Sequence, residues 1–170
     1  MIGRAAKACM SLPDDLFDIT VKPSGLPAGD EQIVLLTISS YFFRLVVLIH
    51  FTDDLSTRQH FARLNCTDVN SMDEKSFIDT ICECGNMIVG TLNRDLANIF
   101  ASVGMSTPNI IDKNCGSLLS SLNFGYSKDF QVTINNEKTF FLTIGVTEFA
   151  DIDFEINTEL EDATGELEMF

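Results

Sequence analysis

The feature that most constrains the fold is an almost uninterrupted apolar segment over residues 33–51. A run of this length is about long enough to span a bilayer. However, Arg44 lies within it after the polar residues 39–41, and a charged side chain at that depth is costly in lipid. The segment is rich in Ile, Val and Phe, which favour strands. We therefore predict no membrane span but two buried strands, residues 33–38 and 42–51, each covered on both faces.

Periodicity and turn residues predict the other elements around this pair of strands. Apolar residues alternate with polar ones on both sides of Asn135–Asn136, as in a hairpin. Asp53 or Asp54 is expected to cap a helix, and Ser71 with Glu74 has the spacing of a capping box. The expected helices cover residues 1–12, 53–64 and 73–98, and the further strands residues 18–22, 109–111, 130–134, 140–146 and 152–156. This order predicts an α+β fold, with two long helices packed on an antiparallel or mixed sheet.

Length and charge limit the classes of function. A chain of 170 residues suits one domain, which we place at residues 1–157, followed by an acidic tail at 158–170. The net charge of −14 would repel nucleic-acid phosphates and anionic lipids, so neither is expected as a partner. Five cysteines, an odd number, and no secretory signal pattern predict reduced thiols and a cytoplasmic location.

The helix expected at residues 73–98 carries the strongest functional pattern. On a helical wheel, one face gathers the apolar residues Phe77, Ile81, Ile88 and Leu92. The opposite face places polar or small residues at i, i+4, i+7 and i+11, with one more close by: Asp79, Glu83, Asn86, Gly90 and Asn93. A plain solvated face would show the same alternation. A glycine inside a helix, however, costs about 1 kcal/mol relative to alanine and invites an explanation.

The spacing of this row resembles the CheC/CheX/FliY family of chemotaxis phosphatases. Glu83 follows Asp79 by four residues, Asn86 follows by three more, and Pro108 comes 22 residues later. The amino-acid sequence of residues 77–90 is also similar to the family's helix, and the order of helices and strands agrees over about residues 15–157. Since residues 1–17 contain no Glu, a second motif is absent there, and the chain looks like the single-motif CheX type.

This resemblance implies a CheC/CheX-like fold and a hydrolase of two-component signalling that acts on the phospho-aspartate of a CheY-like response regulator. Asn86 would orient the attacking water, and Glu83 would dock on the receiver's lysine. Asp79, Gly90 and Asn93 would contact the partner, while Pro108 would be structural. The chain itself would hold no cofactor or metal, because the receiver domain supplies Mg²⁺. The resemblance further implies a homodimer.

Two alternatives belong to other classes of function. A non-catalytic module of the same fold could dock on a receiver or another signalling protein without turnover. A thiol or metal enzyme could use Cys82 and Cys84, which depart from the aliphatic residues usual at these places, as Gly85 also does. On the wheel the two thiols point about 160° apart, so we expect buried small side chains and no metal site.

Overall fold

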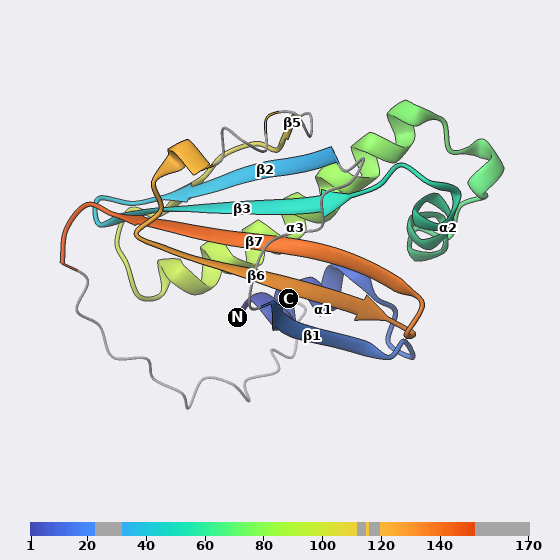
Figure 1. Cartoon of the computed structure of the whole chain (residues 1–170), viewed down its shortest axis with the longest axis horizontal. Helices are drawn as coiled ribbons and strands as arrows, with labels where there is room; N and C mark the ends of the chain where they lie inside the picture. The colour runs from blue at the N-terminus through green and yellow to red at the C-terminus, as the bar shows by residue number, and fades with distance from the viewer. Residues whose placement is uncertain (23–31, 112–114, 116–119, 152–170) are drawn as a thin grey trace, which may run out of the picture.

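The structure is a computed structural model that describes residues 1–22, 32–111, 115 and 120–151. Within these residues, three α-helices accompany one seven-stranded sheet (Figure 1), which confirms the predicted α+β class. The elements are α1 (Ile2–Met10), β1 (Phe17–Lys22), β2 (Gln32–Ser39), β3 (Phe43–Phe51), α2 (Leu55–Leu64), α3 (Glu74–Ala97), β4 (Gly104–Met105), β5 (Asn109–Ile111), β6 (Tyr126–Ile134) and β7 (Lys138–Glu148). The strand expected at 152–156 and the acidic tail at 158–170 lie outside the described residues.

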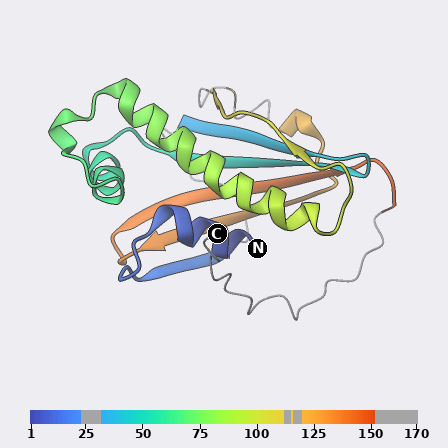
Figure 2. The same cartoon turned by 180° about the vertical axis from the view of Figure 1, so that it is seen from behind.

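The sheet is antiparallel at every described pairing. Its order is β1-β6-β7-β3-β2-β4, and β5 pairs with β2 next to β4. Helices α1 and α3 lie against the same face, while α2 lies beyond the ends of the strands (Figure 2). Only α3, with 24 residues, is long, because α1 and α2 have 9 and 10. Two long helices are predicted from the sequence, and among the described residues only α3 is long.

The apolar segment at 33–51 forms the pair β2 and β3, as predicted. The two strands pair from Gln32 with Phe51 to Ser39 with Arg44, around a turn in which the Ser40 N–H donates to the Phe43 carbonyl at 2.9 Å. From Val46 onward every residue of β3 is buried, so this strand is covered on both faces. Among the described residues, no helix combines the length and the apolarity needed to cross a bilayer.

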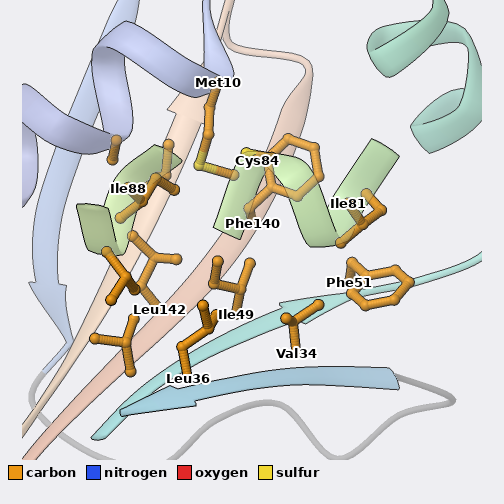
Figure 3. Close-up of a cluster of buried hydrophobic side chains, with 14 of the residues drawn as sticks. Met10, Val34, Leu36, Ile49, Phe51, Ile81, Cys84, Ile88, Phe140 and Leu142 are labelled. Atoms are coloured by element: carbon orange, nitrogen blue, oxygen red, sulfur yellow. The ribbon is translucent and has the colours of Figure 1, made fainter. Parts of the chain in front are cut away.

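The main core lies between α3 and the helix-facing side of the sheet (Figure 3). The four predicted apolar residues of α3 are 0–4% exposed. They pack with side chains of α1, β2, β3 and β7, including Met10, Val34, Leu36, Ile49, Phe140 and Leu142. Gly85 allows this close approach, because a Cβ there would lie 3.0 Å from Leu36 Cδ1 and 3.3 Å from Ile49 Cδ1.

The helix boundaries confirm one predicted cap and correct another. Asp54 caps α2 by accepting a hydrogen bond from the Thr57 N–H at 2.8 Å. The N-cap of α3 is Asp73, which accepts from the Ser76 N–H at 2.8 Å, so the prediction of a capping box at Ser71 is wrong. Ser71 instead ends the short 3₁₀ helix Val69–Ser71, where its hydroxyl donates to the Asp68 carbonyl at 2.7 Å.

The predicted hairpin is formed by β6 and β7. Asn135 and Asn136 have φ values of 53° and 58°, which a type I′ turn requires at both central positions. The Glu137 N–H closes this turn by donating to the Ile134 carbonyl at 3.0 Å. The hairpin therefore takes its geometry from two asparagines, a residue type that tolerates the left-handed region better than most.

The far face of the sheet is more polar than the helix-covered face. A small cluster of Ile33, Val46 and Leu48 is buried there. Next to it, His50 Nε2 lies 3.2 Å from Thr143 Oγ1, and the Thr143 hydroxyl donates to Asp129 Oδ1 at 2.7 Å. His50 is only 3% exposed, so this network brings a titratable group into the interior of the protein.

Candidate functional site

Helix α3 presents its polar face to the surface because its other face is committed to the core. Its first turn is fixed by the Asp73 cap, and its dipole is complemented by Glu74 in the first turn and Arg94 in the last. Phe77 and Ile88 anchor the opposite side, each 0% exposed. The outward orientation of the polar row therefore follows from the burial of the apolar row.

The structure brings Glu83 and Asn86 together on that open face. Glu83 is exposed and Asn86 is half-buried. The Asn86 side-chain amide donates from Nδ2 to Glu83 Oε2 over 3.5 Å, which is long for a hydrogen bond. An interaction this weak would be exchanged readily for contacts with a partner. A carboxylate and a carboxamide thus stand side by side, one turn apart, on a helix supported by the core.

Asp79 and Gly90 extend this row in both directions. Asp79 is exposed, one turn before Glu83. Gly90 has open space around it, because the nearest atom of the described residues to a Cβ there would be Met105 Sδ at 4.0 Å. The protein's own packing does not require glycine at this position, unlike at Gly85. The absence of a side chain leaves the backbone of α3 accessible beside Asn86.

Asn93 and Pro108 lie at the margin of the row. Asn93 is half-buried, and its Oδ1 atom is buried without a hydrogen-bond partner among the described residues. Pro108 lies between β4 and β5 in the segment along the edge of β2, where the Ser106 N–H donates to the Thr37 carbonyl at 2.9 Å. Its position is therefore within the edge of the sheet, away from the turn that directly follows α3.

The thiols of α3 do not form a site. Cys84 is buried against α1, with its Sγ 3.7 Å from the Cys9 carbonyl oxygen, and burial raises the pKa of the Cys84 thiol. The pKa of Cys82 is also raised, first by burial and then by the Asp79 carboxylate. Thiols of raised pKa are poor nucleophiles at neutral pH. No cluster of His, Cys, Asp or Glu suited to a metal occurs within the described part of the chain.

A cavity of about 400 Å³ opens beside Glu83, and the sequence did not indicate it. Three helices line it, with Ala8, Cys9, Ser11 and Leu12 at the end of α1, Phe61, Leu64 and Asn65 at the end of α2, and Asp79, Thr80, Glu83, Cys84 and Met87 on α3. The one signal available in the sequence is Met87, an apolar residue on the polar side of the wheel that is 51% exposed.

Comparison with known proteins shows that the fold of this chain occurs in solved structures. No family model and no curated protein sequence matches the chain. Among solved structures, CheX from Vibrio vulnificus is similar at a TM-score of 0.60 and 18% identity, covering 86% of this chain and 93% of its own. A CheC-like chemotactic protein from Shewanella oneidensis reaches 0.59 at 14% identity, covering 86% and 95%.

A third similar structure is the CheX–CheY–BeF₃–Mg²⁺ complex from Borrelia burgdorferi. Its similarity is a TM-score of 0.59 at 13% identity, covering 85% of this chain and 92% of that chain. All three relationships extend over almost the whole described structure and agree with one another. The chain therefore has the fold of the CheC and CheX proteins, as the resemblance of its sequence implied.

Proposed function

We propose that this protein accelerates hydrolysis of the phospho-aspartate on a CheY-like receiver domain. The observation that carries the proposal is the pairing of Glu83 and Asn86 on the open face of α3, at the spacing that resembles the chemotaxis phosphatases. The fold is shared with a CheX protein whose structure was solved together with CheY. A receiver partner in two-component signalling fits both the row of residues and the fold.

The reaction needs positioning more than covalent participation by the protein. A water oxygen attacks phosphorus, the bond from phosphorus to the aspartate oxygen breaks, and the aspartate carboxylate leaves while inorganic phosphate takes the water's protons. The Asn86 carboxamide offers an acceptor and two donors in one plane, so it can orient the water in line with the leaving oxygen. An amide does this without competing as a nucleophile.

Glu83 serves to dock the partner in register. As an exposed carboxylate one turn from Asn86, it can form a charge-assisted hydrogen bond with the receiver's lysine. Mg²⁺ bound by the receiver supplies neutralisation of the phosphoryl charge. In this proposal Asp79 and Gly90 border the contact, and Asn93 supports it from the margin.

The direct test measures phosphate release from purified receiver domains phosphorylated with a small-molecule phosphodonor. Wild-type protein should accelerate release, and Asn86→Ala should lower the rate about 100-fold, the usual scale for one positioned catalytic group. Asn98→Ala is a matched control, because Asn98 is an exposed asparagine at the C-terminal end of α3, about three turns beyond Asn86. An active Asn86→Ala variant would remove Asn86 from the site. Receiver binding without any acceleration would instead assign a non-catalytic docking module.

The resemblance to CheX also implies a homodimer, which we retain in the proposal. Strand β1 is at the end of the sheet order and pairs only with β6 among the described strands, so it could extend the sheet into a second copy. Light scattering after gel filtration measures the mass directly. A monomeric mass at micromolar concentration would contradict this part of the proposal.

A further inference from the structure

The cavity beside Glu83, which we name the three-helix cavity, has a closed floor and an open rim. Phe61 and Cys84 at its floor are 2% and 6% exposed. Asp79, Glu83 and Met87 at its rim are exposed. The cavity therefore opens onto the same surface as the proposed site and reaches down between α1, α2 and α3.

The charges around this cavity favour a cation. The C-terminal ends of α1 and α2 both line it, and the C-terminal end of a helix carries a partial negative charge. The carboxylates of Asp79 and Glu83 add two full negative charges, whereas no Lys, Arg or His is among the described residues that line the cavity. Arg63, close by on α2, is already engaged with Asp15 through two hydrogen bonds of 2.8 and 2.6 Å.

The sides of the cavity also offer apolar contact to an aliphatic stem. Leu12 follows α1, Leu64 ends α2 and Met87 lies on α3, and together they make the sides of the cavity apolar. Lysine and arginine bury a stem of three or four methylenes along apolar surface while the charged head remains near polar groups. Burial raises the pKa of the Cys9 and Cys84 thiols, so both remain neutral and apolar in character.

We propose that the three-helix cavity binds a lysine or arginine side chain on the surface of the receiver, next to its phosphorylated cleft. This would be a second anchor, separate from the lysine that Glu83 contacts, and the identity of the partner rests on the proposed function. The cavity is continuous with the Glu83 row, so one protein surface can occupy both. Two anchors of the same charge on one side of α3 would fix the orientation in which the receiver docks.

The first test fills the cavity without altering the Glu83–Asn86 pair. Ala8 lines the cavity and is exposed, so Ala8→Trp should fold normally, and Ala97→Trp at an exposed position far along α3 is the control. Binding is measured to a receiver loaded with Mg²⁺ and BeF₃⁻. Ala8→Trp should weaken it about tenfold or more, and Ala97→Trp should have no effect. Equal binding by Ala8→Trp and wild type would overturn the proposal.

The second test examines the cavity without any receiver. Nα-acetyl-lysine amide is titrated into ¹⁵N-labelled protein, with the uncharged Nα-acetyl-norleucine amide as the control. Saturable amide shifts at Leu12, Leu64 and Thr80 should occur with the lysine compound only, and Ala8→Trp should abolish them. Equal shifts with norleucine, or no saturable shift with lysine, would overturn the assignment of a cation. Because no phosphorylated protein is present, this result is independent of whether the proposed phosphatase activity exists.

Discussion

The two faces of α3 differ in how far the packing of the protein determines their residues. On the sheet-facing side, Phe77, Ile81 and Ile88 are 0–1% exposed, and even the glycine there, Gly85, is in tight contact with β2 and β3. On the other side Glu83 is open to solvent, and Gly90 has room for an added methyl group. Packing accounts for the residues of the first face, whereas it requires neither a carboxylate at Glu83 nor a glycine at Gly90. The docking partner proposed above would explain this outward row.

The largest expected effect on stability comes from comparing two adjacent residues that lie on different faces of α3. Ile88→Ala should lower the free energy of unfolding by about 2–5 kcal/mol, because it removes three carbons from the closed core. Met87→Ala, at the neighbouring position that is 51% exposed, should change it by about 0.5 kcal/mol or less. Urea denaturation monitored by circular dichroism measures both. Similar losses for the two variants would mean that the faces of α3 are not energetically distinct.

On the far face of the sheet, burial changes the pKa of a titratable side chain, His50. Burial lowers the pKa of His50 from its ordinary 6.5 to about 4, although the Asp129 carboxylate partly opposes this. Between these two pH values the unfolded chain binds the proton and the folded protein does not, so stability falls as the pH drops from 6.5 to 4. The full loss from His50 is at most about 3 kcal/mol. Urea denaturation at several pH values measures it.

A substitution at His50 separates its contribution to the pH dependence of stability from that of His60, the other buried histidine. The pKa of His60 is also lowered, first by burial, so it contributes in the same direction. His50→Asn should reduce the pH dependence of the free energy of unfolding between pH 6.5 and 4, leaving the contribution of His60. If His50→Asn retained the full dependence, the titrating group would have to lie elsewhere.

Much of the fold and of the outward row could be predicted because both depend on local periodicity. The apolar segment 33–51 predicted β2 and β3, and the hairpin followed from alternation around Asn135–Asn136. The wheel of α3 predicted which face is buried. These patterns repeat within one element, so neighbouring residues in the sequence suffice to read them.

The three-helix cavity could not be predicted, because the chain topology assembles it from distant segments. Leu12 follows α1, Leu64 ends α2 and Glu83 lies on α3, and no periodicity relates one to another. The wheel likewise could not show that Asn93 turns its Oδ1 into the protein, since that depends on the segments packed beside α3. The cap of α3 depended on a local competition, in which Ser71 bonds to Asp68 and leaves the capping position to Asp73.

The smallest expected effects give the most direct comparison, because the same substitution is made on both faces. Gly85→Ala places a methyl group 3.0 Å from Leu36 Cδ1, and overpacking of this kind costs about 1–3 kcal/mol. The better helix propensity of alanine returns about 1 kcal/mol, so the net change should be a loss of up to about 2 kcal/mol. At Gly90, where nothing opposes the methyl group, the same propensity should stabilise the protein by up to about 1 kcal/mol.

Of these two glycines, the one whose substitution lowers stability should not be the one whose substitution weakens receiver binding. Gly90→Ala adds a methyl group in the row of Glu83 and Asn86, so a closely docked receiver should bind more weakly although the protein is more stable. Gly85→Ala faces the sheet and should leave receiver binding unchanged in the folded fraction. Isothermal titration at a temperature where both variants are fully folded separates binding from stability. If Gly90→Ala bound as well as wild type, the partner would not approach the backbone of α3, and Gly90 would no longer belong to the proposed docking row.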